Sequence, residues 1–351
     1  MSSRIAVVLF NLGGPDSPDA VRPFLKNLFS DPAILRMPGV FRWMLGNYIS
    51  RARAPIARAI YDKIGGRSPI VEQTVAQANS LLNRLSEIHE DADIEIFISM
   101  RYWAPMVDEA VKKVKDFGPD QIVLVPLYPQ FSSTTTASSF KSWDDAARKA
   151  GLEAPTARIC CYPRDSGFVA AMAGFIRKGI DEASESGTPR VLFSAHGLPE
   201  KFVQAGDPYQ QQVEMTVAAI LAELGGDEPD YRICYQSRVG RLVWLGPYTD
   251  AEIIQAGQDQ VPVVVVPVAF VSEHSETLVE LDMEYAGLAR ENQVPAYVRA
   301  PTVGTSPEFI DGLAKLVGHA IDHGNGIISG QGHRICPADC LDCLLAETPA
   351  S

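Results

Sequence analysis

Eight short, uninterrupted apolar runs dominate the sequence, and helical patterns separate them. Runs of this length, bounded by turn residues, are typical of strands that are buried on both faces of a parallel sheet. The runs fall into two sets of four, at residues 5–11, 94–99, 121–126 and 158–161 and at residues 190–195, 231–235, 262–268 and 296–299. The pattern predicts an α/β fold with two four-stranded parallel sheets.

The two sets of runs have similar spacing, which predicts two copies of one α/β unit. The last three runs start 27 and 37 residues apart in the first set, and 31 and 34 residues apart in the second. Corresponding runs also end in similar segments, as VPLYPQF and VPVAFVSE do. We therefore expect one domain at 1–165, a second at 166–325 and a C-terminal extension at 326–351.

The first domain carries an insertion of unusual composition. The first two runs start 89 residues apart in the first set and 41 in the second, so about 48 residues are additional, and we place them at about 13–60. The overlapping window 21–70, called the lip below, has nine Lys or Arg, two Asp and many large apolar residues. Such a segment suits an anionic apolar ligand or an anionic membrane surface. A solvated helical hairpin whose Arg stems cover a core is the alternative.

Charge and motifs exclude several classes of function. The chain has a net charge of -12, and because the lip carries +7, the other 301 residues carry -19, which disfavours nucleic acid as a partner. The segments NLGGP and KIGGRSP fit neither dinucleotide nor P-loop motifs, so we expect no nucleotide cofactor.

The sequence contains no apolar run of about 18 residues, and its first apolar run is too short for a signal sequence. We therefore expect a cytoplasmic protein.

A histidine and a line of carboxylates follow two predicted strands of the second set. His196 ends its strand at the carboxyl edge of the sheet, where a general base would be well placed, although a lone histidine is often structural. The spacing of Glu273, Glu276, Glu280 and Glu284 predicts one stripe of an α-helix, with His274 beside it. The alternative to a functional stripe is a solvated acidic face. Imidazole and carboxylate ligands without thiolate suit weak, exchangeable binding of a ferrous-like ion.

Seven ordered segments give the chain a resemblance to the ferrochelatases over its whole length. The segments are NLGGPDS, IYDKIGGRSPI, SMRYWAP, VPLYPQFSSTTTAS, FSAHGLP, CYQSRVG with WLGP, and AFVSEHSETLVELDMEY. The resemblance implies a chelatase fold, with two similar Rossmann-like domains and the active site in the cleft between them. It also implies insertion of Fe2+ into protoporphyrin IX with release of two pyrrole protons, the terminal step of haem synthesis.

The resemblance implies roles for individual residues. His196 is similar to the family's histidine that accepts pyrrole protons, and Glu276 resembles the essential carboxylate opposite it, so we expect these bases on opposing walls. His274 and Glu280 join His196 and Glu276 in contacting the incoming metal. The residues implied to position the macrocycle are Leu12, Tyr61, Ser68, Arg101, Tyr102 and Trp244.

Three cysteines of the C-terminal extension form a separate motif. The spacing Cys336-x3-Cys340-x2-Cys343 favours a metal or cluster over disulfides in a cytoplasmic protein. Some ferrochelatases carry a [2Fe-2S] cluster on such a tail, with a fourth cysteine from the first domain. Ser133 stands where animal members have that cysteine, so we expect the fourth ligand to be Cys161, with Cys160 as the alternative. Zinc held by the three cysteines and His333 is the rival interpretation.

The sequence therefore predicts a ferrochelatase with Fe2+ as substrate. The long apolar lip favours protoporphyrin IX, and it predicts peripheral contact with the inner face of the membrane. The alternatives are a coproporphyrin III ferrochelatase and a non-catalytic porphyrin or haem carrier on the same fold. A carrier needs stacking walls but no proton acceptors, so His196 and Glu276 favour the enzyme. The resemblance also implies a homodimer.

Overall fold

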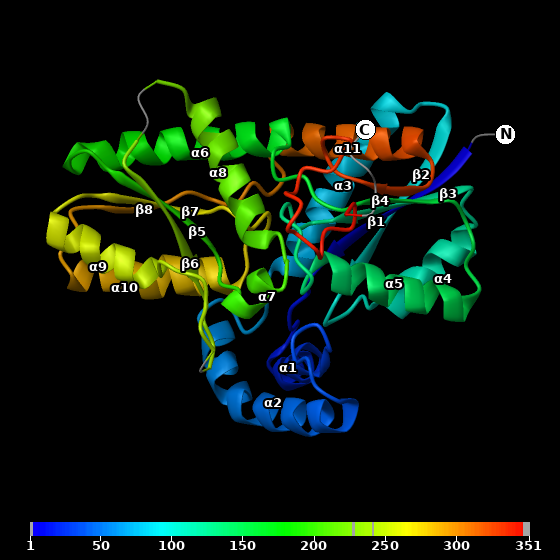
Figure 1. Ribbon diagram of the computed structural model, residues 1–351, viewed down its shortest axis with the longest axis horizontal. Helices are drawn as coiled ribbons and strands as arrows, with labels where there is room; N and C mark the ends of the chain where they lie inside the picture. Colours follow the sequence, from blue (N-terminus) through cyan, green and yellow to red (C-terminus); the bar gives the residue numbers. More distant parts are fainter. Residues whose placement is uncertain (1–2, 227–228, 241, 347–351) are drawn as a thin grey trace. The chain divides into compact units, whose positions relative to one another are not determined.

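The computed structural model describes residues 3–226, 229–240 and 242–346. They form two compact units, each an α/β layer structure around one parallel sheet (Figure 1). Unit 1 comprises Met1–Cys161 and Leu313–Ser329, and unit 2 comprises Tyr162–Gly312 and Gly330–Ser351. The last five residues of the predicted extension, 347–351, lie outside the described part of the chain.

The sheet of unit 1 has five parallel strands in the order β2-β1-β3-β4-β9. The strands are β1 (Ser3–Asn11), β2 (Ala92–Met100), β3 (Gln121–Pro126), β4 (Thr156–Ile159) and β9 (Gly326–Ile328). Helices α3 (Ile70–Ile88) and α11 (Pro307–His323) cover one face, and α4 (Val107–Phe117) and α5 (Thr136–Ala150) cover the other (Figure 1). The apolar run of β1 is fully buried from Ala6 to Leu9, because this strand lies inside the sheet and is covered on both faces.

The sheet of unit 2 has four parallel strands in the order β6-β5-β7-β8. The strands are β5 (Arg190–His196), β6 (Tyr231–Gln236), β7 (Val263–Pro267) and β8 (Tyr297–Arg299). Helices α6 (Ser166–Ala183) and α8 (Tyr209–Leu224) cover one face, and α9 (Thr249–Asp259) and α10 (Ala286–Glu291) cover the other (Figure 1). The short helix α7 (Glu200–Gln204) follows β5, and a π-helix, Glu276–Tyr285, precedes α10. Short 3-10 turns lie at Ser184–Ser186 in this unit and at Pro18–Ala20 in unit 1.

All eight predicted strands are present, and the prediction of an α/β fold with two parallel sheets is confirmed. The first four strands of each unit have the same order, with the second, first, third and fourth strands side by side, as expected for two copies of one arrangement. The expected strand number is wrong for unit 1, because β9 extends its sheet beyond β4. Only three residues form this strand, too few to give a recognisable apolar run.

The lip forms two helices that pack closely against each other, α1 (Val21–Ser30) and α2 (Gly39–Asp62). Gly46 permits this approach, because a Cβ atom there would lie 2.8 Å from the backbone oxygen of Phe29. The facing sides bury an apolar cluster that includes Phe24, Ala54 and Tyr61. The lip is thus a helical hairpin that shares its apolar cluster with residues of unit 1 outside the lip, among them Leu12 and Tyr102.

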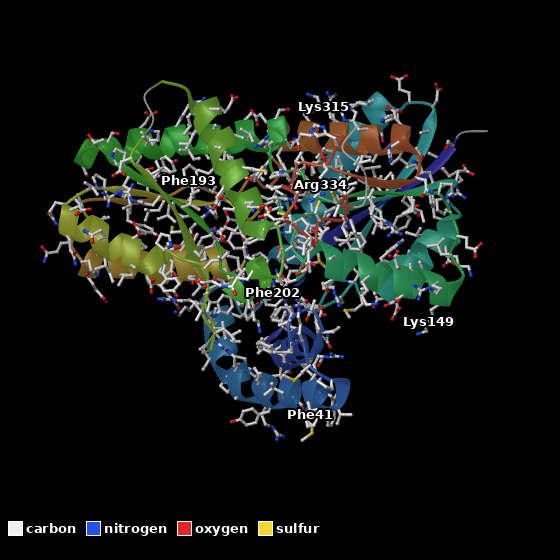
Figure 2. All side chains as sticks on the ribbon, in the orientation of Figure 1. Phe41, Lys149, Phe193, Phe202, Lys315 and Arg334 are labelled. Atoms are coloured by element: carbon white, nitrogen blue, oxygen red, sulfur yellow. The ribbon has the colours of Figure 1, made fainter. Side chains whose placement is uncertain are left out.

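The other side of α2 carries large apolar residues that are exposed. Their exposed fractions are 71% for Val40, 65% for Phe41, 58% for Trp43, 57% for Met44, 70% for Tyr48 and 59% for Ile56. Phe41 projects outward from the helix (Figure 2). Throughout the described residues, no helix is both long and apolar enough to cross a membrane. We call these six residues the α2 apolar face.

Candidate active site

The site in unit 2 begins at His196, the last residue of β5. This strand lies between β6 and β7, so His196 emerges at the carboxyl edge in the middle of the sheet, as expected. The hydroxyl of Tyr209 donates to the backbone oxygen of His196 at 3.0 Å. The imidazole remains 42% exposed. The fold therefore fixes the backbone of His196 and leaves its ring accessible.

Glu276 lies against His196 at the same edge of the sheet. The distance from His196 Nδ1 to Glu276 Oε2 is 2.9 Å, and His274 Nε2 lies 3.5 Å from the same oxygen. The expectation of bases on opposing walls is therefore wrong for this structure. The reason is topological: the parallel strands β5 and β7 end at the same edge of one sheet, so His196 and the segment that follows β7 both start from that edge.

The predicted α-helical stripe of four carboxylates is also not present. Residues Glu276–Tyr285 form a π-helix, and only Glu276 and Glu280 contact the residues around His196. Glu273 precedes the helix and pairs with Arg299 at 2.7 Å, whereas Glu284 is exposed. Pairing with different partners relieves the repulsion that a common stripe would impose.

Glu280 is held by donors from the end of β6 and from its own π-helix. Its carboxylate accepts from the backbone N–H of Ser237 at 2.9 Å, from the Ser237 hydroxyl, from Gln236 Nε2 at 3.2 Å and from the Tyr285 hydroxyl at 3.1 Å. Ser237 adopts a left-handed backbone conformation with φ of 63°. Sequence reasoning missed these three residues, although the segment CYQSRVG places Gln236 and Ser237 at the sheet edge next to His196.

Arg299, at the end of β8, anchors the segment that carries the site. Its guanidinium binds both carboxylate oxygens of Asp282 at 2.7 Å each, and Glu273 Oε1 at 2.7 Å. The backbone N–H of Thr302 also donates to Glu273 Oε1, at 3.0 Å. One cation thereby fixes residues on both sides of Glu276 and Glu280, in the bidentate geometry that arginine favours.

The surroundings of His196, Glu276 and Glu280 shift the pKa values of these groups in different directions. Burial lowers the pKa of His196, but the charge and hydrogen bond of Glu276 outweigh burial, so this pKa is raised. Burial acts to raise the pKa of Glu276, but His196 and His274 lower it well below its usual range. Burial and the neighbouring Glu276 raise the pKa of Glu280. The pair His196–Glu276 thus favours its charged form, whereas Glu280 takes up a proton more readily than an ordinary glutamate.

A preassembled metal cage is not part of this arrangement. Within the ranges that the structure describes, no three His, Cys, Asp or Glu side chains are grouped so that they could hold a metal ion. Of the four expected metal contacts, His196 and His274 converge on one oxygen of Glu276, and both oxygens of Glu280 accept hydrogen bonds. A metal that reaches these groups has to displace protons or hydrogen bonds.

The predicted macrocycle-positioning residues fall into two places in the fold. Trp244 belongs to unit 2, beside Gly197, where a Cβ atom would lie 3.1 Å from the indole ring. The remaining five belong to unit 1. Leu12, Tyr61 and Tyr102 contribute to the apolar cluster under α1, and the backbone of Arg101 and Tyr102 pairs with the end of β1. Ser68 follows α2 and is buried, with its N–H bonded to Pro15 at 2.8 Å.

The three cysteines of the C-terminal extension form one buried cluster in unit 2. Gln212 Nε2 donates to Cys336 Sγ at 3.1 Å, and Cys340 Sγ lies 2.6 Å from Gln211 Oε1. A hydrogen bond from Cys336 lowers the pKa of Cys343 to about 6, which favours the thiolate that binds metals. Cys160 and Cys161 are buried neighbours in unit 1, with their sulfurs 3.6 Å apart. Unit 2 therefore contains the three cysteines of the motif, whereas the predicted fourth ligand, Cys161, belongs to unit 1.

Comparisons with known proteins give one consistent result. A family profile described as Ferrochelatase matches residues 4–321. A ferrochelatase from Caulobacter vibrioides (strain NA1000 / CB15N) is 49% identical over 99% of this chain and 99% of its own length, and one from Pelagibacter ubique is 46% identical over 89% and 90%. Among solved structures, SirB from Bacillus subtilis with Fe3+ has a TM-score of 0.53 at 12% identity, covering 91% of this chain and 95% of its own. At this identity, the last likeness shows the fold alone.

Proposed function

The chain belongs to the ferrochelatase family and is a porphyrin metal chelatase that inserts iron in haem synthesis. On this premise, we propose that its porphyrin is protoporphyrin IX, that His196 accepts a pyrrole proton and that Glu276 stabilises the imidazolium that forms. The observation that supports these roles is the 2.9 Å contact between His196 Nδ1 and Glu276 Oε2. It combines a base that is partly exposed with a carboxylate that stabilises the protonated ring.

The proposed proton path starts at the free nitrogen of His196. With the Nδ1 hydrogen donated to Glu276, the neutral ring presents its Nε2 lone pair to a pyrrole N–H. The imidazolium that forms is stabilised by the carboxylate of Glu276. Glu280, whose pKa is raised, is the acceptor for the second proton. Two protons leave as Fe2+ enters, so the charge on the macrocycle is unchanged.

The test of these roles is anaerobic Fe2+ insertion by His196→Ala and Glu276→Gln, with protoporphyrin IX and with coproporphyrin III. Loss of a general base typically costs about 100-fold or more in rate. Because Glu276 stabilises the protonated form of that base, we expect kcat to fall by at least this factor in both His196→Ala and Glu276→Gln. Porphyrin binding, followed by fluorescence, should persist. Glu284→Gln, on the same π-helix but exposed, is the matched control.

The outcomes separate the candidate functions. Full activity in either variant would refute the roles assigned to His196 and Glu276. A higher kcat/KM for coproporphyrin III would identify the other porphyrin as substrate. Tight porphyrin binding by the unmodified protein without iron insertion would identify a carrier.

We also propose that the α2 apolar face contacts an anionic membrane at its inner surface. The support is the exposure of Phe41 and Trp43, at 65% and 58%, in a lip of net charge +7. Large apolar residues together with arginine on one helical segment are typical of interfacial binding. The protein would then receive an apolar porphyrin where that molecule is most soluble.

For the C-terminal cysteines we propose a [2Fe-2S] cluster held by Cys336, Cys340 and Cys343 with Cys161. The support for this proposal is the spacing and common burial of the three cysteines, one of which has a lowered pKa; among the described residues these thiols are not arranged as a metal site, so binding would require them to move. When bound, such a cluster supplies one-electron redox chemistry, which iron insertion does not need. The zinc alternative differs in using His333, whose Nδ1 lies 2.9 Å from the Gln331 oxygen. The homodimer implied by resemblance stays a prediction.

A further inference from the structure

A buried carboxylate, Asp31, lies directly after α1 in unit 1, and its side chain is 2% exposed. Its Oδ2 accepts from the Tyr102 hydroxyl at 2.8 Å and from the Ser138 hydroxyl at 2.7 Å, and it pairs with Arg101 Nη2 at 2.7 Å. Its Oδ1 accepts from the N–H of Ala33 at 2.8 Å. A buried charge is tolerated only with such partners, so the four donors define one position for this carboxylate.

Arg101 is held from two sides by the same group of residues. Its Nε donates to the Ser138 hydroxyl at 2.8 Å, and this hydroxyl in turn donates to Asp31. Arg101, Ser138 and Asp31 therefore form a closed triangle of hydrogen bonds. The guanidinium is 21% exposed, so its orientation is set by the triangle while part of it remains accessible.

The triangle also connects the lip with the segment formed by the start of α5 and the loop that precedes it. Asp31 begins the connection between α1 and α2, and Ser138 lies in the first turn of α5. A second contact joins the same two segments, because Arg36 Nη2 donates to the Ser133 hydroxyl at 3.1 Å. The two contacts fix the lip relative to Arg101 and Tyr102.

We infer that Asp31 is a positioning residue for porphyrin binding: it orients Arg101 and Tyr102 and holds the lip against them. The inference rests on the proposed function and on the macrocycle-positioning role that the family resemblance implies for Arg101 and Tyr102. A guanidinium binds a carboxylate-bearing ligand well only when its planar donors are correctly oriented. Asp31 supplies that orientation without contacting the ligand.

The experiment measures KM for protoporphyrin IX, KM for Fe2+ and kcat in Asp31→Asn, Arg101→Met and the double variant. We expect Asp31→Asn to raise the porphyrin KM about tenfold, the usual cost of one charge-assisted hydrogen bond, with KM for Fe2+ and kcat within about threefold. Arg101→Met should raise the porphyrin KM at least as much. The double variant should match Arg101→Met alone, because Asp31 acts through Arg101.

Two further variants keep the inference falsifiable if Asp31→Asn fails to fold. Ser138→Ala removes the bridging hydroxyl but no charge, and it should raise the porphyrin KM in the same direction by a smaller factor. Asp93→Asn, which breaks a half-exposed pair with Arg4 in the same unit, should leave all three constants unchanged.

The possible results discriminate between two failures. If Arg101→Met leaves the porphyrin KM unchanged, the proposed role of Arg101 is wrong. If Arg101→Met raises it but neither Asp31→Asn nor Ser138→Ala does, the positioning role of Asp31 is wrong. Additive effects in the double variant would also overturn that role, because they would mean that Asp31 acts independently of Arg101.

Discussion

Replacing two residues of the α2 apolar face should remove most of the proposed membrane affinity. Phe and Trp each bury about 150–250 Å² in full, so exposed fractions of 65% and 58% leave about 90–160 Å² on each of Phe41 and Trp43. At about 25 cal/mol per Å², full transfer from water would contribute about 2–4 kcal/mol per side chain. If only half of this area enters the interface, Phe41→Ser with Trp43→Ser loses about 2–4 kcal/mol in total, which weakens binding about 30-fold or more.

Co-sedimentation with vesicles of phosphatidylcholine, with and without phosphatidylglycerol, measures this affinity. The unmodified chain should bind the anionic vesicles more tightly than the neutral ones, and added salt should weaken that binding because the lip is basic. Iron insertion into detergent-dispersed porphyrin should be unaffected by the double substitution.

Val75→Ser with Ile88→Ser is the matched control, since both residues are exposed apolar positions on α3 in the same unit. This variant should bind vesicles as the unmodified chain does. Equal binding by the Phe41/Trp43 variant and the unmodified chain would refute the membrane role of the α2 apolar face. So would loss of binding in the α3 control alone.

Two further predictions concern the histidine site and the cysteines. Burial lowers the pKa of His196, but Glu276 raises it more, so the net pKa is raised. Because His196 must be neutral to accept a proton, the rate of iron insertion should fall as the pH drops through this raised pKa. In Glu276→Gln the raising interactions are lost, so the acidic limb of the residual activity should move to lower pH; a move to higher pH would contradict the assignment. Anaerobically purified protein should contain about two iron and two acid-labile sulfide per chain, and Cys343→Ser should lose both while Cys234→Ser retains them. Purified protein without sulfide would exclude the cluster.

The strands were predictable because their burial is local in origin. The run Val263–Pro267 is apolar throughout and has flanking turn residues. Its burial on both faces of the sheet can therefore be predicted from the run alone. In contrast, β9 has three residues, and it pairs with β4, a strand far away in the sequence. A segment this short has no pattern of its own, so only the folded chain reveals it.

The residues that support the site were less predictable than the site itself. His196 could be placed from one strand and the rule that ligands meet the carboxyl ends of parallel strands. Arg299 and Asp31 act through contacts with residues 17 and 71 positions away, Asp282 and Tyr102, so their roles depend on tertiary packing. In the sequence, Arg299 ends a strand and Asp31 follows a helix, and neither position distinguishes a positioning residue from a solvated one.

The carboxylates after β7 show why spacing alone was insufficient. Residues four apart lie slightly beyond one turn of an α-helix and slightly short of one turn of a π-helix, so the step from Glu276 to Glu280 fits both. The wider helix gives these two carboxylates different partners: Glu276 pairs with His196, and Glu280 with the donors at the end of β6. As a result, the pKa of Glu276 is lowered and that of Glu280 is raised. Two titrating groups whose pKa values are pushed apart within one turn can divide two tasks, stabilising the imidazolium of His196 and accepting a proton, which a uniform acidic stripe could not do.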